Sequence, residues 1–178
     1  MKNNKQKKQE FEQKGFTMTE VLVYIGILSV IILIISSFVL WSIQSNTKAR
    51  IIRETLDSAR RTMDMITKET REAKSVYSPT TTSSQLSLET KRNLPQGEES
   101  SFVDFFICDT QLCLKKESQD PIAITAKNVE VSSLSFTKVG TAPSSVQIDL
   151  TLNYKNPQNR TEYNFSTNLT STVSLRSY

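Results

Sequence analysis

An uncharged apolar segment of 21 residues, from Val21 to Trp41, constrains this chain more than any other feature. A helix rises about 1.5 Å per residue, so a segment of this length covers about 30 Å, the thickness of a bilayer's hydrocarbon core. The residues after Trp41 lack the small-x-small spacing that is typical of a signal-peptidase site, so we expect the span to be retained. A plain signal anchor is the simplest interpretation of hydropathy alone.

The charges on either side of the span predict its orientation. Cytoplasmic flanks are enriched in lysine and arginine, and this favours a cytoplasmic N-terminus with everything after Trp41 exported. Three cations close beyond the span, Lys48, Arg50 and Arg53, weaken that preference. The cations before the span are Lys2, Lys5, Lys7, Lys8 and Lys14, and the acids are Glu10 and Glu12.

Glu20 lies immediately before this apolar segment, in the sequence Gly15-Phe16-Thr17-Met18-Thr19-Glu20. A charged side chain near the bilayer centre costs roughly 2.5 to 3.5 kcal/mol on insertion scales, and such residues usually have a partner. Glu20 therefore needs a partner of opposite charge.

The pattern Lys14-Gly15-Phe16-Thr17-x-x-Glu20 before an apolar helix resembles the type IV prepilin leader, which pilins share with secretion and competence pseudopilins. The resemblance implies that a prepilin peptidase removes residues 1–15 as a cytoplasmic leader, cuts the Gly15–Phe16 bond and methylates Phe16, and that Glu20 serves assembly. The cut would create an α-amine with a pKa near 8, which could neutralise Glu20. If the amine and the carboxylate belong to neighbouring subunits, the pair sets the register of a helical stack. Met18 and Thr19 stand where the family more often has apolar residues. The span lacks the proline of many major pilins, which favours a minor pilin or pseudopilin.

Helical periodicity continues beyond the span. Apolar residues recur on one face of the segment that follows, and no proline occurs before Pro79. We therefore expect one helix from near Phe16 to near Ser75, with a transmembrane half at residues 16–41 and an amphipathic half at 42–76. Two helices broken around Ser45 to Thr47 are the alternative. The predicted stripe consists of Ile52, Leu56, Ala59, Met63, Ile66 and Ala73.

Residues 77–178 alternate between apolar and polar positions, which is typical of strands with one wet face. The fold class that follows is α+β: a long helix packed on an antiparallel β-sheet head, as in type IV pilins. In the strand from Val129 to Phe136 the apolar positions change parity, which predicts a bulge near Ser132 and Ser133. The other strands are expected at Gln85–Thr90, Phe102–Cys108, Leu112–Lys116, Val146–Tyr154 and Tyr163–Leu175.

Cys108 and Cys113 flank a tight turn in the exported region, where a disulfide can form if the Cα atoms approach within about 6 to 7 Å. Two free thiols or a buried pair are the alternatives. The chain contains no histidine, so we expect no metal site, no cofactor and no catalytic triad. Glu98 and Glu99 are expected in a solvated loop. The three sequons, at Asn159, Asn164 and Asn168, are expected to be incidental.

The charge of the exported part argues against a strongly basic nucleic-acid binder. The leader carries five of the 22 basic and two of the 18 acidic side chains, so its removal leaves a net charge of +1. Arg60 and Arg61 form a local cluster that a DNA-handling competence subunit could use, although solvated helix charge is the simpler explanation.

These observations predict a non-enzymatic minor pilin or pseudopilin with one span in the inner or plasma membrane and an extracytoplasmic head. Segment 66–76 and the strands after it also resemble, more loosely, the head of J-type or W-type minor pilins. The resemblance implies three kinds of partner: the prepilin peptidase, other pilin subunits and membrane lipid. It also implies incorporation near the tip of a pilus or of a secretion or competence pseudopilus, with DNA or secreted protein as conceivable cargo. A signal-anchored binding protein or adhesin is the alternative.

Overall fold

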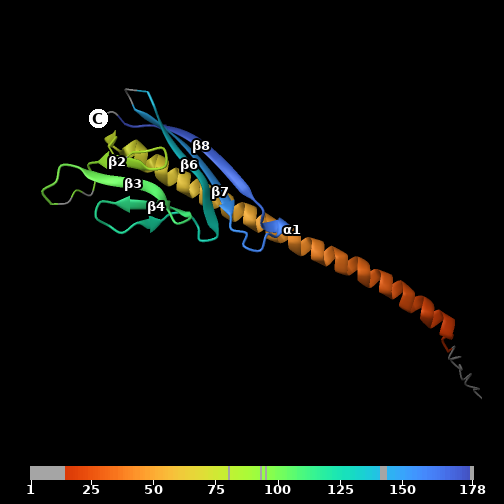
Figure 1. Cartoon of the computed structure of the whole chain (residues 1–178). Coiled ribbons are helices and arrows are strands. Elements are labelled where there is room, and N and C mark those ends of the chain that lie inside the picture. The colour runs from red at the N-terminus through yellow and green to blue at the C-terminus, as the bar shows by residue number, and fades with distance from the viewer. Residues whose placement is uncertain (1–14, 80, 93, 95, 141–143, 177–178) are drawn as a thin grey trace, which may run out of the picture. The chain divides into compact units, whose positions relative to one another are not determined.

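The computed structural model describes residues 15–79, 81–92, 94, 96–140 and 144–176. The chain divides into two compact units, one ending at Ile43 and one starting at Gln44, and each is described by itself. It contains one long N-terminal helix and antiparallel sheets of five and three strands. This architecture confirms the predicted α+β class, and Figure 1 shows the elements by colour along the chain.

Helix α1 runs from Met18 to Glu72 as one element, so the alternative with a break around residues 45–47 is wrong. Its first half is long and apolar enough to cross a membrane, and none of the apolar window is buried within the structure. Its last turn carries Arg71, a cation that suits the negative end of the helix dipole. The chain then passes directly into a short strand.

The first sheet is a meander in which each strand pairs antiparallel with its neighbour in sequence. The turn between its third and fourth strands places Asp109 at φ 54°, a left-handed conformation that aspartate tolerates better than most residues. All the strands of this sheet that the sequence predicts are present, and two short edge strands are added. The five are β1 (Ser75–Val76), β2 (Leu86–Thr90), β3 (Ser101–Cys108), β4 (Gln111–Lys116) and β5 (Ile122–Ala123).

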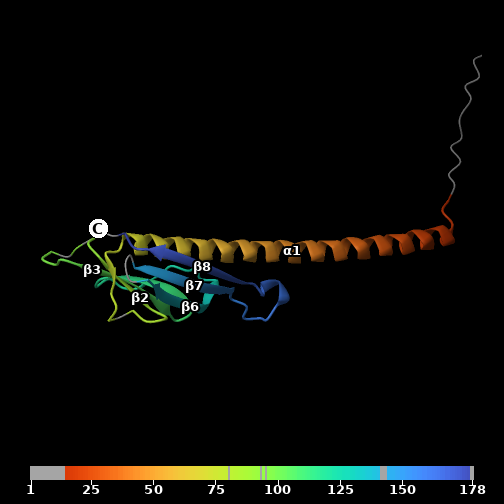
Figure 2. The same ribbon diagram turned by 90° about the horizontal axis from the view of Figure 1, so that it is seen from above.

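The second sheet consists of β6 (Val129–Val139), β7 (Ser145–Tyr154) and β8 (Ser166–Ser174), again in sequence order. Its register shifts between Val131 and Ser133, which confirms the predicted bulge. The connection between β7 and β8 contains a 3₁₀ turn at Thr161–Tyr163. Figure 2 shows this sheet lying along the second half of α1.

The second half of α1 buries a face that differs in part from the predicted stripe. Ala59, Met63, Ile66 and Ala73 are buried as predicted, but Ile52 and Leu56 are only half-buried. At this end of the face, Ile51 and polar residues are buried instead. The buried hydroxyl residues of the face are Thr55, Ser58, Thr62 and Thr70.

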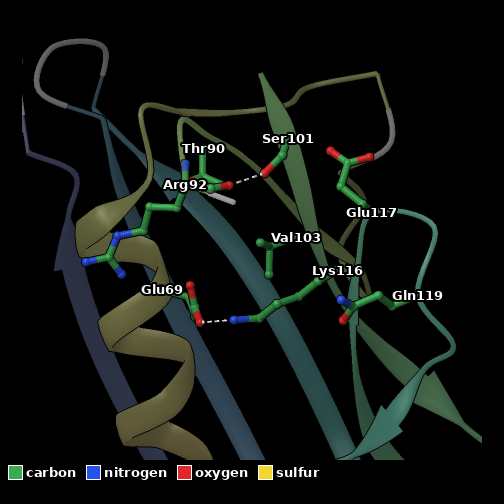
Figure 3. A pocket seen from close by; sticks show the side chains of 8 residues that line it. All are labelled: Glu69, Thr90, Arg92, Ser101, Val103, Lys116, Glu117 and Gln119. Carbon is green, nitrogen blue, oxygen red and sulfur yellow. Dashed lines mark hydrogen bonds and ion pairs between the residues drawn. The ribbon is translucent and has the colours of Figure 1, made fainter. Parts of the chain in front are cut away.

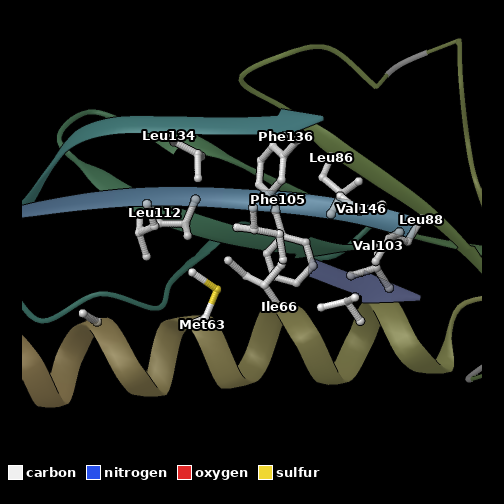
Figure 4. Close-up of a cluster of buried hydrophobic side chains, with 14 of the residues drawn as sticks. Met63, Ile66, Leu86, Leu88, Val103, Phe105, Leu112, Leu134, Phe136 and Val146 are labelled. Atoms are coloured by element: carbon white, nitrogen blue, oxygen red, sulfur yellow. The ribbon is translucent and has the colours of Figure 1, made fainter. Parts of the chain in front are cut away.

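The core lies between this helix face and the two sheets. Met63 and Ile66 point from the helix toward Phe105 of β3, as Figure 4 shows. Phe105 and Ile66 are both fully buried, so they anchor the contact between the helix and the sheet. The other sheet residues of the cluster are Leu86, Leu88, Val103, Leu112, Val129, Leu134, Phe136, Val146, Ile148, Leu150, Leu152, Val173 and Leu175.

Two hydroxyls on the buried helix face offer a matched test of this packing. Ser58 Oγ accepts a hydrogen bond from the Ala126 backbone N–H at 3.1 Å, whereas Thr62 Oγ1 is buried without a partner among the described residues. Ser58→Ala should lower the free energy of unfolding by about 1 kcal/mol, because it leaves a donor unpaired. Thr62→Val, which keeps the shape, should be neutral or stabilising. Urea unfolding of the full chain in detergent, read by pulse proteolysis, measures both. Equal losses would contradict the assignment.

Candidate assembly site

Thr17 immediately precedes helix α1 and caps it. Its Oγ1 accepts a hydrogen bond from the Glu20 backbone N–H at 3.3 Å, and its carbonyl accepts from the N–H groups of Glu20 and Val21 at 3.1 and 3.2 Å. A threonine three residues before a glutamate is the spacing of a capping box, and the threonine half of that motif forms here. This role of Thr17 was not among the expectations from the sequence, although the Thr-x-x-Glu spacing indicates it.

The Glu20 carboxylate lies in the first turn of α1 beside one aromatic residue. The Tyr24 hydroxyl, one turn further along, donates to Glu20 Oε1 at 3.4 Å. The Phe16 ring meets the Tyr24 ring edge-on, with centroids 6.4 Å apart and planes at 78°. Phe16, Glu20 and Tyr24 therefore lie together at the start of the helix, where the helix dipole favours a negative charge.

This environment satisfies Glu20 only in part. A hydrogen bond of 3.4 Å lies beyond the usual range, and a phenol brings no compensating charge. None of the ion pairs between described residues includes Glu20. A carboxylate that enters lipid needs a cation close by to offset the loss of hydration, so the site is suited to receive a positive group.

The Gly15–Phe16 bond lies just outside the helix. Both residues are exposed, and Phe16 shows 74 % of its surface. A Cβ added to Gly15 would meet no atom within 4 Å, so packing among the described residues does not require glycine there. A bare Cα does suit a peptidase that must bind the backbone closely. The rest of the predicted leader, residues 1–14, lies outside the described residues.

Two of the hydroxyls inside the span are satisfied locally. Ser29 Oγ donates to the Ile25 carbonyl at 2.8 Å, and Ser37 Oγ donates to the Leu33 carbonyl at 3.0 Å. Such bonds to the preceding turn remove the cost of placing a hydroxyl in lipid. Trp41 ends the span, where amphipathic aromatic rings favour the membrane interface. Unlike these two hydroxyls, the Glu20 carboxylate just before the span has only the long bond from Tyr24 among the described residues.

A polar pocket of about 90 Å³ lies between the end of α1 and the first sheet (Figure 3). Lys116 Nζ of β4 bonds Glu69 Oε1 of the helix at 2.7 Å, and Ser101 Oγ donates to the Arg92 carbonyl at 2.7 Å. The Arg92 guanidinium in turn pairs with Glu72. The ion pair of Lys116 and Glu69 thus joins the helix to β4, and the pair of Arg92 and Glu72 joins the helix to the segment after β2.

Glu89 forms a second junction beside that pocket. Lys74 Nζ and the hydroxyls of Ser75 and Ser100 donate to its carboxylate at 2.7, 2.7 and 2.6 Å. The bond from Lys74 and those from the two serines lower the pKa of Glu89 to about 2. The chain that leaves α1 is therefore held to β2 by an acid that stays ionised far below neutral pH.

The two cysteines lie on either side of the β3–β4 turn and are joined in the structure. Their Cα atoms are 5.9 Å apart, within the range that a disulfide spans. Cys113 is buried and Cys108 is half-buried. The bond crosses the tip of a hairpin that the sheet already aligns, because Phe106 is paired with Cys113 and Cys108 with Gln111.

The remaining candidates from the sequence are not brought into one site. Arg60 and Arg61 are exposed on α1, and Arg61 Nε donates to the Asp57 carbonyl at 3.2 Å. Glu98 and Glu99 are exposed in the loop between β2 and β3. The sequon residues Asn159, Asn164 and Asn168 lie exposed on the β7–β8 connection and on β8.

Comparison with known proteins gives a match for the region that contains Gly15, Phe16 and Glu20. Residues 12–36 match the family model of the prokaryotic N-terminal methylation motif, the hallmark of type IV prepilin-like proteins. The match covers Gly15, Phe16 and Glu20 together with the first part of the span. No curated protein and no solved structure matches the chain.

The hairpin can be tested directly. Mass spectrometry after alkylation without reductant should show two unmodified cysteines, and two alkylated ones after reduction. The double variant Cys108→Ser, Cys113→Ser should lose about 2 kcal/mol of unfolding free energy, because closing a short loop restricts the unfolded chain. Reduction should produce the same loss in the parent and none in the variant. Alkylation of both thiols without reductant would contradict the bridge.

Proposed function

We propose that this chain is a minor pilin or pseudopilin, a structural subunit that enters a type IV pilus or a secretion or competence pseudopilus through its N-terminal helix. The methylation motif over residues 12–36 carries the proposal. Proteins with this motif are processed by a prepilin peptidase and assemble with other pilins. The exposed Gly15–Phe16 bond and the incompletely satisfied Glu20 supply the two chemical features that such processing and assembly require.

Processing and assembly are linked through charge. Cleavage at Gly15 leaves Phe16 as the first residue, with an α-amine that is positive at neutral pH even after one methylation. Glu20 becomes the fifth residue of the mature chain. An incoming amine that meets the Glu20 carboxylate of a neighbour replaces two isolated charges in lipid with one neutral pair. This contact favours one axial offset between adjacent helices.

The contacts between the head and α1 support the role of a structural subunit. The head is joined to the second half of α1 by a shared core and by two ion pairs, one from Glu69 to Lys116 of β4 and one from Glu72 to Arg92 in the β2–β3 connection. A force or a contact on the head therefore reaches the helix directly. The absence of proline from the span favours a minor subunit. The proposal includes a position of this subunit near the tip of the filament.

The first test concerns processing. Co-expression with a prepilin peptidase should give a chain that begins at Phe16 and carries one extra methyl group on its N-terminal nitrogen, as read by intact-mass and peptide spectrometry. The described structure accommodates Gly15→Ala, since the added Cβ would meet no atom within 4 Å. The substitution should nevertheless reduce cleavage strongly, because the peptidase has to bind the backbone closely at this position. Assembled material that still begins at Met1 would refute the proposal.

The second test separates the two roles of Glu20. Glu20→Gln keeps a residue that suits the third position of a capping box but removes the charge. It should be cleaved and inserted normally, while its recovery in sheared filaments should fall at least tenfold relative to the parent.

Thr17→Ala provides the matched control for that experiment, because it removes the helix cap and leaves the carboxylate. It should cost only about 1 kcal/mol of local helix stability and retain most incorporation. If Glu20→Gln incorporates as well as the parent, the charge-pair argument fails. If both variants fail equally, capping rather than charge explains the requirement.

A further inference from the structure

We propose that a basic collar at one end of the head binds anionic phospholipid headgroups and holds the unassembled subunit against the membrane surface. The inference rests on the proposed function only in that the segment Val21–Trp41 lies in a bilayer. The basic collar consists of Lys48, Arg50 and Arg53 of α1, Lys127 from the β5–β6 connection, and Lys155 and Arg160 from the β7–β8 connection.

The β-sheet part of the basic collar is held against the helix by hydrogen bonds. Asn128 Nδ2 donates to Glu54 Oε1 of α1 at 3.0 Å, and the Lys155 N–H donates to the Asn128 carbonyl at 2.9 Å. Lys127 precedes Asn128 in the chain. Two loops that are far apart in sequence thus bring Lys127 and Lys155 to the helix at Glu54, one residue from Arg53.

Two tyrosines extend this contact to Arg160. The Tyr154 and Tyr163 rings lie 5.9 Å apart, and Arg160 Cζ lies 5.2 Å from the centre of the Tyr163 ring. Burial raises the pKa of Tyr154, and the nearby Glu54 carboxylate and Tyr163 add to the rise while the Arg50 guanidinium opposes it. Arg50, Tyr154, Tyr163 and Arg160 therefore occupy one region, at the end of β7 marked by the β7–β8 connection in Figure 1.

The balance of charge in this region is positive. Three acids lie among the six cations, and two of them are already bonded: Glu54 to the Asn128 amide and Glu162 to Arg160 at 2.6 Å. The third, Glu130, follows at the start of β6, and Asp57 lies one turn further along the helix. Of the six cations, only Lys155 is half-buried, and the others are exposed.

The position of the basic collar in the chain favours a lipid surface over other anions. Lys48 follows the end of the span, Trp41, by seven residues, so the first cations must lie close to the headgroups. Each lysine or arginine at an anionic surface strengthens binding about fivefold, and the effect fades within a Debye length. Tyr154 and Tyr163 are of the type that membrane interfaces favour. Lys48, Arg50 and Arg53 weaken the orientation signal of the leader, and binding to headgroups would explain why cations are present there.

Hydrogen exchange of the full chain in nanodiscs tests this inference. We compare discs of phosphatidylcholine with discs that contain one third phosphatidylglycerol, and we follow peptides covering residues 125–130 and 153–165. Exchange in these peptides should slow at least fivefold in the anionic discs, and high salt should abolish the difference. The triple variant Lys127→Gln, Lys155→Gln, Arg160→Gln should show no dependence on lipid charge.

A matched triple variant at the other end of the head controls for net charge. Lys68, Lys91 and Lys138 are exposed and lie beyond the collar, near the end of α1 and the β6–β7 turn. Changing them to Gln should leave the lipid effect intact. Equal exchange in both discs, or equal loss in both triple variants, would overturn the inference. So would protection by a short DNA duplex in phosphatidylcholine discs that anionic lipid fails to give.

The two proposals fail separately. The nanodisc measurement does not depend on cleavage, so a chain that is never processed can still show protection by anionic lipid. Loss of that protection leaves the behaviour of Glu20→Gln in filaments unaffected. A failure in one experiment therefore identifies which proposal is wrong.

Discussion

A carboxylate at the start of an uncharged span is the constraint on which the N-terminal part of this protein depends. Glu20 serves two physical roles at once: its backbone is capped by Thr17, and its side chain adds negative charge where the helix dipole favours it. Neither role offsets the cost of bringing the charge into lipid. In the function that we propose, a free helix in the membrane carries an unpaired carboxylate, and association with a second chain that supplies an amine would neutralise it.

The second half of the same helix packs one face against two sheets. This face includes four hydroxyl residues among its apolar residues: Thr55, Ser58, Thr62 and Thr70. Thr55 bonds back to the Ile51 carbonyl at 2.9 Å, and Ser58 bonds the Ala126 N–H, so both hydroxyls are compatible with burial. Small residues allow backbone to approach backbone, while Ile66 and Met63 fill the space beside Phe105.

The sequence predicts elements well where local pattern decides them. Period-two alternation locates the long strands, and the change of parity after Val131 locates the bulge. The stripe fails at Ile52 and Leu56 because an apolar count ignores threonine and serine. Thr55 and Ser58 are buried at this end of the face, and hydrogen bonds satisfy both hydroxyls. The division into two sheets, the Glu89 junction and the basic collar were not predictable, since they depend on contacts between residues 11 to 74 positions apart.

The strands pair locally, whereas the basic collar depends on a contact between distant parts of the chain. Both sheets are meanders, so every strand pairs with a neighbour in sequence, and such local pairing carries a low cost in loop closure. The contact from Asn128 to Glu54 joins the segment before β6 to α1 across 74 positions, a longer loop closure than any strand pairing of the two sheets requires. This contact places the loop cations of the basic collar beside the helix. The surface that we assign to lipid therefore depends on the folded head and not on the helix alone.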